Sequence, residues 1–158
     1  MFNITNEIKK AFNGDAWHGN HVMQTLNNVK PECAFEHFIP NAHSIAEIAL
    51  HLTAWTEEVT SRLMGNQASE PALGDWPLPE SKSPQAWEKI IFNFKLANEE
   101  LIRQCELVKE NSWNDETKDE RSPALGTGVT NIELLNGLVQ HHAYHSGQIA
   151  LLSKFQSV

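Results

Sequence analysis

Apolar residues recur every three or four positions along most of the chain, which is the spacing of helices that bury one face. The pattern predicts five helical segments, at residues 4–12, 22–30, 44–63, 83–111 and 130–154. No segment shows the strict alternation of apolar and polar residues that marks a half-buried strand. The chain is therefore predicted to be all-α, most simply a four-helix bundle with long connecting loops.

Capping signals indicate where the three long helices begin. Two capping boxes, Ser44–Glu47 and Thr130–Glu133, place a hydroxyl at the N-cap and a carboxylate three residues later. Ser83–Pro84 combines an N-cap with proline at the first helical position. The segments 66–82 and 112–129 are broken by proline and glycine, so they are predicted to be long loops. Loops of this length in compact domains often shape or cover a functional site.

Length, charge and cysteine content narrow the class of protein. The 158 residues suit a single domain, 1–158, that is large enough to bury a core. The formal net charge of −8 and the scattered basic residues argue against nucleic acid as a partner. No apolar run is long enough to cross a bilayer, and the start lacks a signal-peptide pattern. The two cysteines, Cys33 and Cys105, are expected to be reduced thiols. We therefore expect a cytoplasmic protein with no membrane partner.

Three of the eight histidines lie in a single five-residue stretch, 141–145, inside the last predicted helix. His141 and His145 are four residues apart, so they lie one turn apart on the face that also carries Leu134, Leu138 and Leu152. Two imidazoles that point into an apolar core need partners for their ring nitrogens, because desolvation without partners is costly. Two explanations are open for this pair, namely hydrogen-bonded core histidines and a bound metal ion.

A metal site in a bundle draws its ligands from facing helices. His51 lies at the edge of the apolar stripe of the helix at 44–63, where a neighbouring helix could cover it. Three neutral imidazoles with one open position suit zinc, and also nickel, cobalt, copper or iron. His142 is a second choice in place of His141, since it is three residues from His145. His142 also stands where the HExxH motif has glutamate, so a zinc-protease helix is not supported.

The other aromatic, histidine and acidic residues are interpreted mainly as structural. The tryptophans are expected to anchor the core and loops, at Trp17, Trp55, Trp76, Trp87 and Trp113. His37 and His43 are expected to be exposed, and His21 has no distinguishing context. His18 either caps a turn or faces the site. A hydrolase would also gain from a carboxylate base near the metal. Glu58 lies two turns from His51 on the same side, whereas Glu47 is assigned to its capping box.

Four stretches of the sequence resemble the DinB/YfiT-like superfamily, and the likeness spans nearly the whole chain. They are Ala16–Gly19, Ala42–Ile45 continuing to His51–Trp55, Arg62–Gly65, and Gln140–Ile149, of which the last is the most specific. The resemblance implies a four-helix bundle, a homodimer, and a divalent metal held by one histidine of the second helix and two of the last. Matched position by position, these ligands are His51, His141 and His145.

Proteins similar in this way include transferases and isomerases that use low-molecular-weight thiols. The resemblance thus implies a protein that binds a divalent metal, zinc or nickel, and transfers a thiol cosubstrate to a small electrophile. The alternatives are a metal-dependent hydrolase and a metal-binding or stress-response protein without turnover. An open metal position can hold a thiol as the nucleophilic thiolate. Gln148, three residues after His145, could orient that ring through its second nitrogen.

Overall fold

The computed structural model describes residues 3–117, 119, 122 and 124–157. The α-helices in this part of the chain are α1 (Ile4–Asn13), α2 (Val22–Asn27), α3 (Ile45–Leu63), α4 (Pro84–Leu107) and α5 (Asn131–Leu152). Short 3-10 turns are added at Pro31–Cys33, Glu110–Ser112 and Ser153–Ser157. The described ranges contain no strand, and an isolated β-bridge joins Glu116 to Thr130. The all-α prediction is confirmed.

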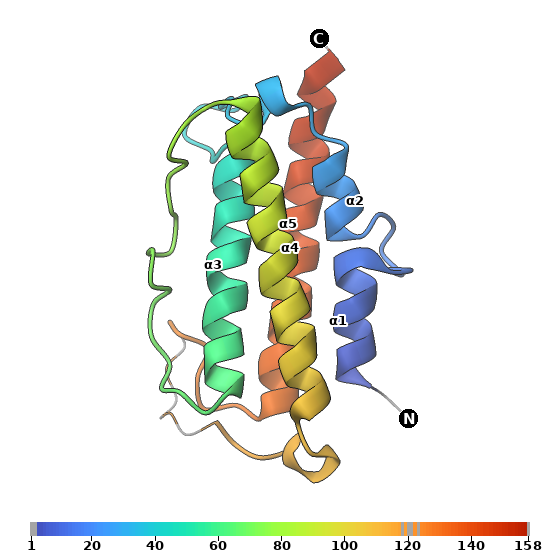
Figure 1. Ribbon diagram of the computed structural model, residues 1–158, viewed down its shortest axis with the longest axis vertical. Helices are drawn as coiled ribbons and strands as arrows, with labels where there is room; N and C mark the ends of the chain where they lie inside the picture. Colours follow the sequence, from blue (N-terminus) through green and yellow to red (C-terminus); the bar gives the residue numbers. More distant parts are fainter. Residues whose placement is uncertain (1–2, 118, 120–121, 123, 158) are drawn as a thin grey trace.

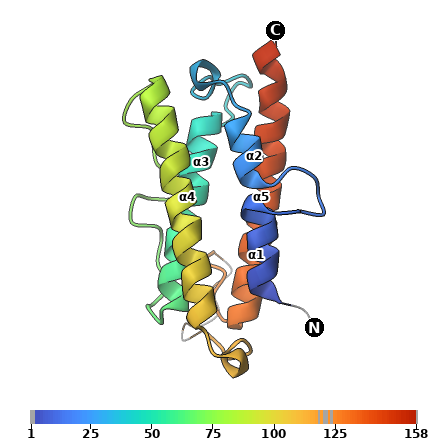
Figure 2. The same cartoon turned by 45° about the vertical axis from the view of Figure 1, so that its right-hand side comes forward.

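The helices form a four-column bundle in which the first column is split. α3, α4 and α5 stand side by side, and α1 and α2 stand one above the other along the same direction (Figures 1 and 2). Both short helices contact α4 and α5. The loop between them begins at Gly14, whose backbone closes α1 in an extended conformation. The predicted four-helix bundle is therefore confirmed, with α1 and α2 together as one column.

The long 64–83 connection follows from the direction of the helices. α3 and α4 both run downward in Figure 1, whereas α5 runs upward. The chain must therefore return along the outside of the bundle between α3 and α4, as the green segment in Figure 1 shows. One long crossover of this kind is a known variant of the four-helix bundle. The crossover passes α3 along its length, which places this loop next to residues of that helix.

Two apolar clusters fill the core, with a band of buried polar residues between them. One cluster includes Trp87 and Phe94, and the other includes Leu101 and Leu135. The polar residues that lie between them along the long helices are Thr53 and Thr56 on α3, Asn98 on α4, and His142, His145 and Ser146 on α5. A polar band inside a bundle needs internal partners. The candidate site lies in this band.

The predicted starts of the three long helices are confirmed, but three predicted helix ends are not, since α2 ends at Asn27 and not at residue 30. Ser44 and Thr130 each form a complete capping box, and Ser83 caps α4 through the amide of Ala86. α4 was expected to continue to Asn111, but it ends at Leu107, because Val108 has an extended backbone with ψ of 128°. α5 ends at Leu152 and passes into a 3-10 turn. No helix in the described chain is both long and apolar enough to span a membrane.

Candidate metal centre

The structure brings together the three histidines named from the sequence. One ring nitrogen from each of His51, His141 and His145 lies within 4.8 Å of the other two. His51 comes from α3 and the others from α5, which packs against it. The Nε2 atoms of His51 and His141 are 2.9 Å apart. Two nitrogens bound to one tetrahedral metal at about 2.1 Å are roughly 3.4 Å apart, so the group fits a metal ion. These three histidines could hold one.

His51 is oriented by Asp75, which belongs to the 64–83 crossover. The Nδ1 atom of His51 lies 2.6 Å from the backbone oxygen of Asp75 and 3.2 Å from its carboxylate Oδ1. Because a carbonyl oxygen only accepts, Nδ1 carries the proton and Nε2 presents its lone pair to His141. Asp75 is held in turn by Trp55, whose Nε1 donates to Oδ1 at 2.7 Å. Such partners fix the tautomer and orientation of metal-binding histidines.

His145 is oriented in the same way by a neighbour on its own helix. Its Nδ1 lies 2.6 Å from Oε1 of Gln148, so Nδ1 donates to this oxygen. The predicted contact between Gln148 and His145 is confirmed. With Nδ1 protonated, Nε2 of His145 is left as the lone-pair nitrogen. Both His51 and His145 therefore offer the same ring atom, Nε2, for binding.

Burial lowers the pKa of all three imidazoles. Desolvation is the largest cause in each case, and it brings the pKa of His141 to about 4. The neighbouring imidazoles lower the pKa of His141 further, since two adjacent rings cannot both carry a charge without repulsion. At neutral pH all three rings are uncharged. The neutral imidazole is the form that binds a metal.

His142 lies outside this group because it is hydrogen-bonded to α3. Thr56 donates its hydroxyl to the backbone oxygen of Leu52 at 2.7 Å, so it accepts from Nε2 of His142 at 3.0 Å. The ring of His142 also packs beside Phe94, with 5.6 Å between centroids. Desolvation lowers the pKa of His142 to about 3. The alternative neighbour is thus a hydrogen-bonded core histidine, and His141 is the one that meets His51.

A cavity of about 530 Å³, which we name the metal cavity, includes His51 and His145 in its wall. The rest of the wall is mostly apolar or aromatic, with Ile39, Ile48, Trp76, Tyr144, Leu151 and Leu152. Sites for small molecules commonly have this size and a mainly apolar lining. Gln148 and Asp75, the partners of the two histidines, also line it.

The crossover loop covers the site through Trp76. Its indole stacks between two imidazoles, with its ring centroid 3.6 Å from that of His43 and 3.9 Å from that of His51. His43 was expected to be exposed, and it is, although its ring also stacks on Trp76 and lines the metal cavity. The structural role given to Trp76 is therefore too narrow, since it forms a wall of the site.

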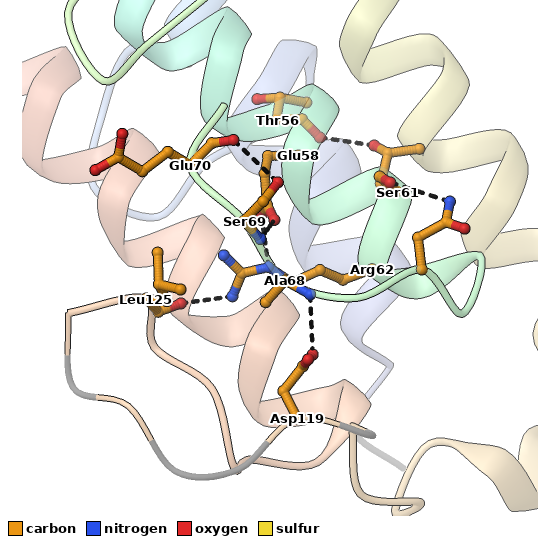
Figure 3. A network of polar contacts seen from close by, with 11 residues as sticks. Thr56, Glu58, Ser61, Arg62, Ala68, Ser69, Glu70, Asp119 and Leu125 are labelled. Atoms are coloured by element: carbon orange, nitrogen blue, oxygen red, sulfur yellow. Dashed lines mark hydrogen bonds and ion pairs between the residues drawn. The ribbon is translucent and has the colours of Figure 1, made fainter. Parts of the chain in front are cut away.

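The two carboxylates considered as bases are occupied elsewhere. Glu47 completes its capping box, with Oε2 accepting from the amide of Ser44 at 2.7 Å. Glu58 makes a buried ion pair with Arg62 at 2.5 Å and accepts from the amide of Ser69 at 2.9 Å (Figure 3). Neither residue lines the metal cavity. The carboxylate that does line it, Asp75, was not identified from the sequence.

Among the other sequence expectations, the structure corrects the role given to Trp17. Trp17 is not an anchor, because its side chain is fully exposed at 102%. His18 is also exposed, outside the histidine group. Cys33 and Cys105 are unpaired, as expected, and burial raises the pKa of the Cys105 thiol to about 12. Cys105 is therefore an inert core residue.

Comparisons with known proteins complete this picture. No curated protein and no solved structure matches the chain. The model of the DinB family matches residues 1–154, which is nearly the full length and includes all three histidines of the group. The chain therefore belongs to the DinB family.

Proposed function

We propose that the chain is a metal-dependent thiol S-transferase in which His51, His141 and His145 bind one zinc or nickel ion. The observation that carries the proposal is the convergence of three neutral imidazoles, two of which line a cavity sized for a small molecule. Membership of the DinB family supports it. A divalent ion bound by three histidines supplies an open position that stabilises a thiol as its thiolate, the nucleophilic form.

The surrounding residues prepare the site for this chemistry. Asp75 and Gln148 hold the Nδ1 protons of His51 and His145, so neither ring has to change tautomer to bind. Trp76 and Tyr144 contribute aromatic walls, and both contact the ring of His145. A wall of this kind favours a small apolar electrophile over a charged one, because burial of an unpaired charge is costly.

A metal-dependent hydrolase is the less favoured alternative. A hydrolase would gain from a free carboxylate next to the open position. Glu58 is ion-paired with Arg62, and Oδ1 of Asp75 is held by Trp55. Asp75 also lies at Nδ1 of His51, the ring nitrogen that does not face the histidine group. A transferase needs no such base, which is why the transferase is preferred.

The experiment is a conjugation assay with metal-loaded protein. Cysteine, glutathione and coenzyme A are each offered with 1-chloro-2,4-dinitrobenzene, and the thioether is followed by absorbance. The sulfur–carbon bond forms while chloride leaves and the thiol proton is released. We expect one of the thiols to be conjugated at a rate that depends on the metal and is lost in His51→Ala. Activity that survives His51→Ala would contradict the mechanism, and full metal content without turnover would indicate a binding protein.

We also propose that the chain forms a single domain over residues 1–158, acts as a homodimer, and works in the cytoplasm. The unpaired state of Cys33 and Cys105 agrees with a reducing compartment. The dimer is tested by light scattering during size-exclusion chromatography, in which a monomer mass at all concentrations would refute it. Limited proteolysis tests the single domain, because a stable fragment much shorter than the chain would contradict it.

A further inference from the structure

The outward side of α5 is an exposed helical surface without charged residues. We name it the α5 face, and its members, all exposed, are Asn136, Gln140, Tyr144, Gly147 and Leu151. They share one side of the helix, because successive members are three or four residues apart. α5 packs against α3, α1 and α2, so its exposed residues point away from the bundle. The sequence has no Asp, Glu, Lys or Arg between Glu133 and Lys154.

The exposed side of α4 shows how unusual this is within the same bundle. It carries six exposed charged residues, namely Glu88, Lys89, Lys95, Glu99, Arg103 and Glu106. A strongly charged partner would find no opposite charge on the α5 face. Two copies of this chain, each with a formal net charge of −8, repel each other least where neither surface carries acidic groups. The α5 face therefore favours a second copy of the chain as its partner.

The two ends of the α5 face carry opposite charges. Glu133, which also caps α5, lies at its start, and Lys154 lies just after its end. Two α5 helices packed in the same direction would bring like charges together at both ends. An antiparallel pair instead brings each end next to the opposite charge of the other copy. Such a pair has two-fold symmetry, which is the commonest symmetry of homodimers. The face is thus complementary to itself in the antiparallel direction.

This arrangement places large residues opposite small ones. When the charged ends are aligned, the midpoint of the pair falls between Ala143 and Tyr144. Tyr144 then lies opposite Ala143 of the second copy, and Gln140 lies opposite its Gly147. A Cβ atom added at Gly147 would meet no described atom within 4 Å, so packing inside the chain does not require glycine there. Its missing side chain leaves room for Gln140 of the second copy.

A fully exposed tryptophan flanks the α5 face. Trp17 belongs to the loop between α1 and α2, which projects from the bundle at about the middle of α5 (Figure 2). Asn20 of the same loop lines a cavity of about 310 Å³ together with Ala150 of α5. Tryptophan is highly buried on average and is enriched among the residues that dominate protein interfaces. A second copy on the α5 face reaches this loop and buries Trp17.

The α5 face also forms one rim of the metal cavity. Tyr144 and Leu151 line that cavity, and they are 66% and 61% exposed, so this rim is open to solvent. In the antiparallel arrangement, the residues opposite the rim are Asn136 and Gln140 of the second copy. A second copy in this position therefore adds side chains to the site.

We propose that a second copy of this chain packs its α5 antiparallel on the α5 face and closes the metal cavity with its Asn136 and Gln140. The proposal rests on the proposed homodimer and names its surface. Closure from this side excludes water from the cavity, which strengthens the electrostatic interactions inside it. The site is then complete only in the dimer.

Cross-linking tests the direction of the two helices. Ala143→Cys and Ala150→Cys are made separately in the Cys33→Ser chain, and each is treated with a short bismaleimide. Cys105 is buried and its thiol has a raised pKa, so it stays unreactive. In the antiparallel pair, the two copies of residue 143 are offset by about 1.5 Å along the helices, and those of residue 150 by about 20 Å. We expect a covalent dimer from Ala143→Cys only, and any other pattern would overturn the proposal.

Tyr144→Glu tests the surface itself, with Phe92→Glu on α4 as the matched control. Phe92 is 56% exposed, so each variant replaces an exposed aromatic ring by a carboxylate. Tyr144→Glu places two carboxylates near the two-fold axis and is expected to weaken the dimer at least about tenfold, or about 1.4 kcal/mol. Phe92→Glu is expected to dimerise as the parent protein does. The mass is measured by light scattering over a range of concentrations.

The outcomes separate the surface from the homodimer. A dimer that Tyr144→Glu leaves intact, or equal weakening in both variants, would refute the surface and leave the homodimer standing. A parent protein that is monomeric at all concentrations would refute both. Neither measurement requires metal or turnover, so a failure of the transferase would leave these results unaffected.

Discussion

Gln148 provides a sensitive test of how the histidine group is held. Nδ1 of His145 donates to Oε1 of Gln148 at 2.6 Å, and His145 is buried, with 5% of its surface exposed. Gln148→Leu keeps the volume but removes the acceptor, so a buried N–H is left without this partner and the ring loses its fixed tautomer. Removing such a partner typically lowers metal affinity about 10- to 100-fold, or about 1.4 to 2.7 kcal/mol.

By the same reasoning, replacement of Asp75 is expected to have a smaller effect on metal affinity. Asp75→Ala removes the carboxylate next to His51 but keeps the backbone oxygen, which makes the shorter contact of 2.6 Å. We therefore expect Asp75→Ala to lower metal affinity less than Gln148→Leu does. The assay is a competition titration for zinc against a chromogenic chelator at neutral pH. Gln148→Glu is the control, because it retains an oxygen that accepts from His145. A Gln148→Leu affinity within about twofold of the parent would show that this contact does not support binding.

Three further predictions concern polar residues inside the bundle. His142→Leu is expected to leave metal content unchanged but to lower the melting temperature, since Thr56 loses its partner. The metal-free protein is expected to become less stable to urea as the pH falls from about 6.5 to 4. The pKa of His141 drops from 6.5 to about 4 on folding, so the unfolded chain binds more protons in that interval. The shift corresponds to about 3 kcal/mol of unfolding free energy, and a stability that does not change with pH would contradict the prediction. Arg62→Met is expected to destabilise by about 3 to 5 kcal/mol because Glu58 is left buried without its partner, and the added change Glu58→Gln should restore part of the loss.

Helix positions could be predicted because their signals are local. The capping boxes at Ser44 and Thr130 depend on residues three apart, and both form as predicted. The end of α4 was missed because Leu107 and Val108 continue the apolar spacing, although the backbone has already become extended at Val108. An apolar pair at a helix end can pack equally well just outside the helix, so periodicity alone does not mark the boundary.

Only part of the candidate site could be predicted from the sequence. The pair His141 and His145 follows from helical spacing, and His51 follows from its helix and the family resemblance. Asp75 and Trp76 could not be found this way, because they lie in a loop without periodicity, 24 residues from His51 in the case of Asp75. Their placement depends on the crossover between two parallel helices (Figure 1). A tryptophan between turn-forming residues, Gly74–Pro77, was the local sign that this loop packs against something.

The central claim is that these three histidines bind one divalent metal ion. The most direct measurement is metal analysis of tag-free protein after exposure to equimolar zinc or nickel and removal of the excess. We predict one ion per chain in the parent protein and in His142→Ala, and loss of the ion in His141→Ala, although the two histidines are neighbours in the chain. Less than about a tenth of an equivalent in the parent, or the same metal content in His141→Ala as in the parent, would contradict the account.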